Sequence, residues 1–223
     1  MLMLLEKERN QVVEYCRMMQ SHQLTKGTGG NISVKNQERN LIAISPSGVE
    51  YSTMRPEDVV VLYPDGSKAD GELRASTEWG MHLGILNKRP DIGAVVHTHS
   101  TFAVTLACAH LELPAVHYLI GYAGVGISKV PCIPYYPFGT GELAEAAGNK
   151  FAELPNLMAL LLGNHGLICG GADINAAFNA AEEIEFVCEL YYRQLTIGAE
   201  LHLLSEEDMN IAAQCFAAYG QKK

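Results

Sequence analysis

The chain has 223 residues, 48% of them hydrophobic, with a formal net charge of -9 at pH 7 and a pI near 5.3. This length and apolar content suit one large domain with a full core, so a single domain over residues 1–223 is expected. The acidic balance argues against nucleic acid or a membrane surface as partners, because both need a basic stripe. The six cysteines form no Cys-x-x-Cys pair, and no segment resembles a signal or a membrane span, so a reduced, cytoplasmic protein is expected.

The N-terminal part of the chain predicts a helix followed by antiparallel strands. Apolar positions at near-helical spacing indicate an amphipathic helix over residues 3–21. A glycine-rich bend, residues 26–31, then runs into a strand, and such a bend turns backbone N–H groups toward an anion. A second strand, residues 41–44, ends in the hydroxyl-rich turn Ser45-Pro-Ser-Gly48, and a turn after residues 59–63 indicates a hairpin.

The next helix begins near Ser76 or Thr77, one of which should be its N-cap, and stops before Arg89-Pro90. A helix start favours negative charge, so it is a third candidate anion site. Glu78 falls in the first turn, where an isolated glutamate more often only complements the helix dipole. His82 lies one turn further on, so the two side chains share a helix face.

Two histidines alternate at the end of a buried strand, in Ala94-Val-Val-His-Thr-His-Ser100. Residues i and i+2 of a strand point to one face, so His97 and His99 can present two nitrogens to one cation. A second apolar run, residues 157–162, ends beside a third histidine, His165. Three histidines with a carboxylate or an open position are typical of a catalytic zinc. A two-metal hydrolase of the His-x-His-x-Asp type would need an aspartate at position 101, which holds Thr101.

The rest of the chain predicts helices with short strands between them. Residues 101–110 are expected to be helical, and prolines confine the short strand 130–134 to an edge or a strand end. After the loop 135–140, Thr140 should cap a helix running through Ala147. Asp173 should cap a long helix to about Leu195, and a last helix should run from Ser205 to about Tyr219.

Taken together and in order, seven motifs resemble the class II aldolase/adducin family over nearly the whole chain, and most closely its L-fuculose-1-phosphate aldolases. They are Gly27-Thr-Gly-Gly-Asn31, Ser45-Pro-Ser-Gly48, Ser76-Thr-Glu-Trp79, Val95-Val-His-Thr-His99, His117-Tyr118, Pro137-Phe-Gly-Thr140 and Asn164-His-Gly-Leu167. The resemblance implies an α/β fold, a three-layer α/β/α domain around a mainly antiparallel central sheet. It also implies a homotetramer with active sites at the interfaces between subunits.

Carried over position by position, the resemblance assigns a role to each site residue. His97, His99 and His165 would ligate one Zn2+ per subunit, with Glu78 as both a resting-state ligand and the catalytic base. Tyr118 of a neighbouring subunit would donate the proton to the aldehyde oxygen. The substrate phosphate would lie against Gly30, Asn31, Ser47, Gly48, Ser76 and Thr77, and Phe138 and Tyr219 would close over the site.

The activity that this implies is the reversible cleavage of a ketose 1-phosphate, L-fuculose 1-phosphate or a similar sugar phosphate, to dihydroxyacetone phosphate and an aldehyde such as L-lactaldehyde. A 4-epimerase of the same family would carry aspartate at position 78 and would need an acidic residue to serve the second face. Residues 118–130 of this chain contain no acidic residue. A dehydratase or decarboxylase would keep the same histidines and Glu78, so both stay open. A non-catalytic assembly module like the adducin head would have lost these ligands.

Overall fold

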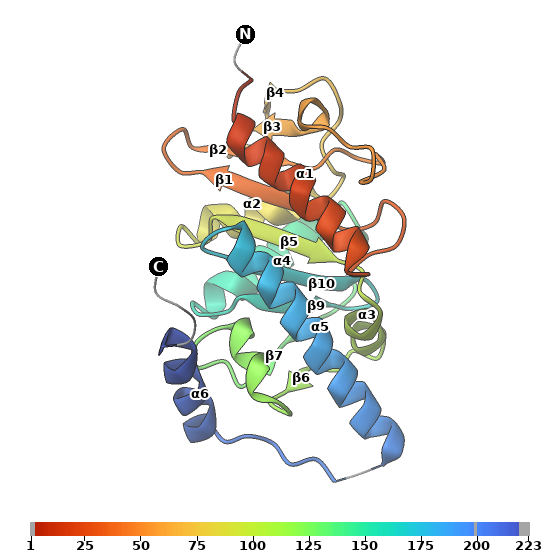
Figure 1. Cartoon of the computed structure of the whole chain (residues 1–223), viewed down its shortest axis with the longest axis vertical. Helices are drawn as coiled ribbons and strands as arrows, with labels where there is room; N and C mark the ends of the chain where they lie inside the picture. Colours follow the sequence, from red (N-terminus) through yellow and green to blue (C-terminus); the bar gives the residue numbers. More distant parts are fainter. Residues whose placement is uncertain (1–2, 199, 219–223) are drawn as a thin grey trace.

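An eight-stranded sheet runs through the middle of the computed structural model, which describes residues 3–198 and 200–218 (Figure 1). Its strands in spatial order are β4 (Lys68–Asp70), β3 (Val60–Leu62), β2 (Leu41–Ile44), β1 (Asn31–Asn36), β5 (Ala94–Thr98), β10 (Gly166–Gly171), β9 (Ala159–Leu162) and β8 (Cys132–Ile133). Every neighbouring pair is antiparallel except β8 and β9, so the predicted mainly antiparallel sheet is confirmed. The predicted hairpin is β3–β4, and the proline-flanked β8 is an edge strand.

Helices cover both faces of this sheet, which gives the predicted three layers. On one face lie α1 (Glu6–Ser21), α3 (Thr101–Cys108) and α5 (Ile174–Ile197), of which α1 and α5 cross the near side in Figure 1. On the other lie α2 (Trp79–Lys88) and α4 (Gly141–Glu153). The strands have a period of two, so in β9 Leu161 joins one core cluster while Leu160 and Leu162 join the other. Burial on both faces explains why these strands are continuous apolar runs.

Two helix caps predicted from the sequence are present. Thr140 Oγ1 accepts a hydrogen bond from Leu143 N at 3.3 Å, and Asp173 Oδ1 accepts one from Ala176 N at 2.8 Å. The helix after Thr140 continues to Glu153, beyond the predicted Ala147.

The predicted N-cap of α2 at Ser76 or Thr77 is wrong, because the cap position is Glu78. The cause is a tertiary contact: Ser76 N donates to Ser45 O at 3.0 Å, which draws this residue toward the loop after β2 and out of the helix. Ser76 Oγ accepts instead from Glu78 N at 3.2 Å. Glu78 occupies the cap position, but its side chain makes no capping hydrogen bond, so the carboxylate is available for other contacts.

The remaining elements lie toward the β8 side of the fold and at the hairpin. They are β6 (Leu113–Pro114), β7 (Lys129–Val130), α6 (Glu206–Ala218) and the 3-10 helices η1 (Pro56–Asp58) and η2 (Tyr118–Ala123). The helix α6 packs on η2, where the rings of Tyr122 and Phe216 are 5.2 Å apart. Tyr219 lies outside the described residues. Among the residues described, no helix combines the length and apolar character needed to cross a membrane.

Candidate functional site

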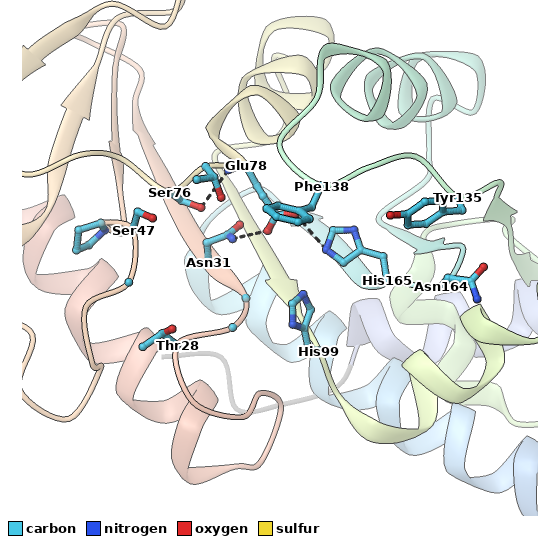
Figure 2. A pocket seen from close by; sticks show the side chains of 15 residues that line it. Thr28, Asn31, Ser47, Ser76, Glu78, His99, Tyr135, Phe138, Asn164 and His165 are labelled. Carbon is cyan, nitrogen blue, oxygen red and sulfur yellow. Dashed lines mark hydrogen bonds and ion pairs between the residues drawn. The ribbon is translucent and has the colours of Figure 1, made fainter.

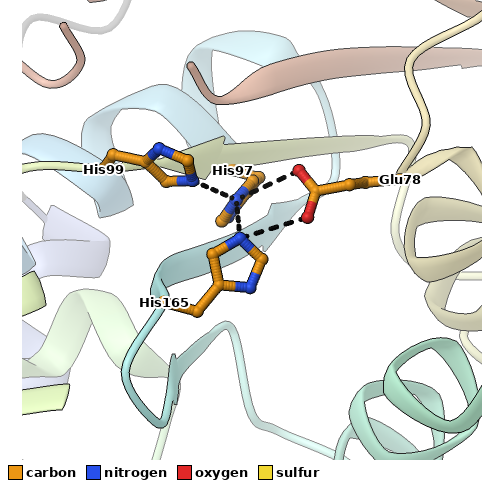
Figure 3. Close-up of side chains that lie close together, drawn as sticks. All are labelled: Glu78, His97, His99 and His165. Atoms are coloured by element: carbon orange, nitrogen blue, oxygen red, sulfur yellow. Dashed lines mark hydrogen bonds and ion pairs between the residues drawn. The ribbon is translucent and has the colours of Figure 1, made fainter. Parts of the chain in front are cut away.

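Glu78, His97, His99 and His165 converge at one end of the central strands, with their ligating atoms all within 4.8 Å of one another (Figure 3). The Nε2 atom of His97 is 3.0 Å from His99 Nε2 and 3.2 Å from His165 Nε2. The carboxylate of Glu78 reaches His165 Nε2 at 3.1 Å and His97 Nε2 at 3.4 Å. The structure thus brings together all four predicted ligands, although 87 residues separate the first from the last.

The fold places these side chains through elements that are rigid or tightly packed. His97 lies in β5, which is paired with β1 on one side and β10 on the other, and His99 follows two residues later. His165 lies in the short turn between β9 and β10. That turn approaches β5 closely, since a Cβ on Gly166 would lie 2.4 Å from the carbonyl oxygen of Thr98. A glycine is required there for the third histidine to reach the other two.

The loop after His99 is held by a partly buried acid from a distant helix. Glu185 of α5 accepts hydrogen bonds from Ser100 Oγ, Phe102 N and Ala103 N, each at 2.8 Å. The carboxylate therefore satisfies free N–H groups at the start of α3. This anchor fixes where β5 ends and hence where His99 lies.

The protonation states of the cluster suit a cation. His97 Nδ1–H donates to the carbonyl oxygen of Leu167 at 2.9 Å, so its Nε2 is unprotonated and faces the cluster. Burial lowers the pKa of His97 well below the usual value and also lowers that of His99, so both imidazoles are neutral at pH 7. Burial opposes ionisation of Glu78, but His97, His165 and Asn31 together outweigh it and lower its pKa. Neutral imidazoles around one carboxylate are the form that binds a divalent metal.

The geometry fits such a metal. Two nitrogens bound to one tetrahedral zinc, each at about 2.0–2.1 Å, are about 3.3 Å apart, close to the Nε2 spacings in the cluster. Among the described residues, the buried atoms Glu78 Oε1 and His165 Nδ1 have no hydrogen-bond partner. A cation between the four side chains would satisfy the carboxylate oxygen and the converging lone pairs. The cluster is therefore a candidate metal centre.

A cavity of about 540 Å³ opens beside the cluster (Figure 2). Its lining contains all the residues predicted to hold the phosphate, namely Gly30, Asn31, Ser47, Gly48, Ser76 and Thr77, together with Phe138 at its mouth. Two of the loops are tied together, because Ser76 N donates to Ser45 O and Ser47 N donates to Arg74 O, each at 3.0 Å. No lysine or arginine lines this cavity in the part of the chain that the structure describes. Hydroxyl groups, backbone amides and a bound metal would have to hold an anion there.

The cavity is also lined by residues that the sequence did not predict for the site, whereas one predicted residue, Tyr118, lies elsewhere. Thr28, Tyr135 and Asn164 also line it, and Figure 2 shows them with the predicted residues. Thr28 and Asn164 lie inside two of the sequence motifs and Tyr135 precedes a third, so motif membership was the available clue. Tyr118 does not line the cavity of its own chain; its side chain is 50% exposed and stacks near Phe216. Tyr118 at an interface stays a prediction.

The glycine-rich loop that lines the cavity is held by a hydrogen bond from Tyr51, a residue that the sequence analysis did not identify. Tyr51 is 2% exposed, and its hydroxyl donates to Gly30 O at 2.6 Å and lies 3.3 Å from Gly29 O. Gly30 has a φ of +69°, and a Cβ there would lie 2.6 Å from the carbonyl oxygen of His97. The loop is thus pressed against the strand that carries the cluster.

Tyr51→Phe is expected to loosen this loop. Leaving the buried Gly30 carbonyl without its donor should lower the free energy of unfolding by about 1–3 kcal/mol. We also expect KM for a phosphorylated substrate to rise about 2- to 10-fold, the worth of one hydrogen bond. Urea unfolding and steady-state kinetics measure both, with Tyr63→Phe at a 48% exposed tyrosine as the control. Unchanged stability and KM in Tyr51→Phe would show that the hydroxyl does not hold the loop.

A three-layer α/β/α fold has central strands that end at a three-histidine, one-carboxylate cluster, beside a cavity whose described lining holds no lysine or arginine. This is the arrangement of a metal-dependent enzyme. Residues 10–192 match the Class II Aldolase and Adducin N-terminal domain, and the chain belongs to this family. It is a class II aldolase, a lyase. The prediction of family, fold and enzyme class is therefore confirmed.

Several named relatives cover almost the whole chain. A protein of Bacillus thuringiensis serovar kurstaki named 5-deoxy-D-ribulose 1-phosphate aldolase is 51% identical over 99% of this chain and 100% of its own length. A 5-methylthioribulose-1-phosphate/5-deoxyribulose-1-phosphate aldolase of Rhodospirillum rubrum is 37% identical over 95% of this chain and 92% of its own. The solved structure of an L-fuculose 1-phosphate aldolase superposes with a TM-score of 0.88 at 36% identity, covering 96% of this chain and 98% of that one.

Proposed function

We propose that this aldolase reversibly cleaves a 5-deoxyketopentose 1-phosphate, of the 5-deoxyribulose 1-phosphate type, into dihydroxyacetone phosphate and acetaldehyde. The observation that carries the proposal is that three of the four cluster residues, Glu78, His99 and His165, line one cavity together with the six residues predicted to hold the phosphate. The choice of sugar rests on the 51% identity to a relative that bears this name, against 36% for the fuculose-type structure. We further propose zinc as the metal, one ion per chain, because three imidazoles and one carboxylate form a typical catalytic zinc site.

A divalent metal bound by Glu78, His97, His99 and His165 would supply Lewis-acid stabilisation of the negative charge that develops on the substrate carbonyl oxygen. The chain itself supplies the base. In the condensation direction, the Glu78 carboxylate accepts a proton from C3 of dihydroxyacetone phosphate, and this carbon then bonds to the aldehyde carbon. The aldehyde oxygen takes up a proton in this step, and Tyr118 of a neighbouring subunit is the proposed donor. Because its pKa is lowered, Glu78 is ionised at neutral pH.

The phosphate group serves as a handle that sets the reacting carbons beside Glu78. Ser47, Ser76 and Thr77 offer hydroxyl donors and the Gly30 loop offers backbone amides, and all of these residues line the cavity. Holding the substrate at its far end lowers the entropic cost of aligning the bond to be cleaved. The absence of a lysine or arginine among the described lining residues makes these loops the main anchor.

The aldehyde end of the substrate would meet an apolar wall. Tyr135 and Phe138 line the cavity and are 53% and 69% exposed, so they stand at its mouth. A terminal methyl group, as in 5-deoxypentose and 6-deoxyhexose phosphates, suits such aromatic surfaces. We propose that Tyr118 of a neighbouring subunit in a homotetramer, and Tyr219 near the end of the chain, complete this part of the site.

L-Fuculose 1-phosphate is the second candidate substrate, favoured by the TM-score of 0.88 to the fuculose-type structure. This ketose is one carbon and one hydroxyl longer and would release L-lactaldehyde. The same cluster and the same phosphate loops would act on it. The aromatic wall formed by Tyr135 and Phe138, together with the proposed Tyr118 and Tyr219, would distinguish the two.

Cleavage assays with matched ketose phosphates test the proposal. We expect kcat/KM for 5-deoxy-D-ribulose 1-phosphate to exceed that for L-fuculose 1-phosphate by about 10-fold or more, the usual worth of one added carbon in a fitted pocket. The unphosphorylated ketose, as control, should show no measurable cleavage. A higher kcat/KM with L-fuculose 1-phosphate would instead support the second candidate. Release of dihydroxyacetone phosphate from neither ketose would reject both.

A further inference from the structure

His82 is a buried histidine that the chemistry above does not use. It lies on α2 one turn after Glu78, and none of its surface is exposed. Its ring contacts two side chains on one face of β1: Nδ1 is 2.8 Å from Ser33 Oγ, and Nε2 is 2.5 Å from Asn31 Oδ1. Asn31 in turn donates from Nδ2 to Glu78 Oε2 at 2.8 Å. Figure 2 shows this last bond between the labelled Asn31 and Glu78.

The charge of Glu78 determines the direction of each hydrogen bond in the network of Ser33, His82, Asn31 and Glu78. The carboxylate accepts only, so Asn31 must present its NH2 group to it and its Oδ1 to His82. His82 Nε2 must then carry the ring proton, and its Nδ1 accepts from the hydroxyl of Ser33. Burial lowers the pKa of His82 to about 4, which agrees with a neutral ring that holds one proton.

Without His82, Asn31 has no fixed orientation. The amide could rotate to place Oδ1 against the carboxylate of Glu78 or could turn toward the cavity, which it also lines. Asn31 lies outside the histidine cluster, and its hydrogen bond to Oε2 of Glu78 helps to hold the carboxylate in place. The position of the carboxylate therefore depends on a residue that touches neither substrate nor metal.

We propose that His82 is a positioning residue for the aldol reaction. Its Nε2–H locks the Asn31 amide with the NH2 group toward Glu78, and this holds the carboxylate in line with the carbon whose proton it moves. The inference rests on the proposed function only in assigning that proton transfer to Glu78. The locked network itself is a property of the folded chain.

Two variants of similar size separate positioning from packing. In His82→Gln the side-chain amide nitrogen reaches about as far as Nε2 and can donate to Asn31, whereas in His82→Asn the shorter amide reaches only the position of Nδ1, near Ser33. Each variant keeps one of the two ring contacts, so both should lose similar stability. We expect kcat of His82→Asn to fall about 10- to 100-fold, as for lost outer partners of metal ligands, with KM changing less than kcat. His82→Gln should recover most of this loss, and both should keep their bound metal.

Three measurements decide the outcome. Kinetics and thermal unfolding support a positioning role if kcat is much lower in His82→Asn than in His82→Gln while the two melting temperatures agree. Equal losses of kcat in both variants, or a wild-type kcat in His82→Asn, would overturn it. Nitrogen-15 NMR of the wild-type enzyme, with His82→Gln to assign the signals, should show the neutral Nε2–H tautomer at pH 7. A charged ring or the Nδ1–H tautomer would refute the network independently of activity. If the wild type cleaves no ketose 1-phosphate yet shows the Nε2–H tautomer, the proposed function fails and the network stands.

Discussion

Glu78→Gln is expected to leave the fold and the bound metal largely intact while slowing the exchange of the C3 hydrogen of dihydroxyacetone phosphate with solvent by about 10²–10⁴-fold, the usual contribution of a positioned base. The glutamine keeps the size of the side chain, and its carbonyl oxygen can still face the histidines. It cannot accept a proton at neutral pH. Proton NMR of dihydroxyacetone phosphate in deuterium oxide measures the exchange directly, without any aldehyde present.

The matched control is Glu72→Gln, which neutralises an exposed glutamate six positions earlier that does not line the cavity. It should exchange at the wild-type rate. Metal content measured on the same samples, with added zinc where needed, separates loss of the base from loss of the ion. A Glu78→Gln enzyme with a full equivalent of metal and wild-type exchange would show that another group moves this proton.

His97→Ala is expected to lower both the bound metal and the activity, because it removes the central ligand of the cluster. His97 Nε2 lies within 3.4 Å of His99, His165 and Glu78, so its loss leaves an incomplete donor set. Loss of a residue that only hydrogen-bonds to a metal ligand typically lowers metal affinity about 10–100-fold, and loss of His97 itself should lower it further. Elemental analysis of the purified protein and a competition assay with a chelator measure the effect.

Because His97 is fully buried, His99→Ala serves as a second variant with less risk to the core. His202→Ala, at an exposed histidine outside the cluster, is the control and should retain metal and activity. Circular dichroism before and after adding zinc separates unfolding from metal loss. Retention of a full equivalent of zinc by both His97→Ala and His99→Ala would refute the assignment of the ligands.

Local chemistry was readable from the sequence. The alternation of His97 and His99 follows from strand geometry alone, since residues two apart share a face, and the apolar run that precedes them marks the strand as buried. Thr140 and Asp173 cap their helices because their side chains need only the backbone three residues ahead. The order and type of the motifs also predicted the family, and the comparisons confirm it.

Contacts between distant segments lay beyond local rules. The residues around Ser76 predicted that it caps a helix. In the structure its N–H donates to Ser45 O instead, and Glu78 occupies the cap position. Nothing in the spacing of residues connects Glu185 with the start of α3, or Tyr51 with the carbonyl of Gly30. For His82, the sequence placed it on the same helix face as Glu78, but the structure puts Asn31 between them.

The sequence by itself determined the kinds of groups in this protein: which residues can bind a metal, which turns expose amides to an anion, and which runs must be buried. These depend on side-chain chemistry and on periodicities within one strand or helix. The tertiary structure alone decided which groups meet, because pairing β5 with β10 carries His165 to His97, and packing α2 against β1 sets Glu78, Asn31 and His82 in one network. Hydrogen bonds between strands and close packing at glycines act across any distance in the chain, so no local pattern encodes them.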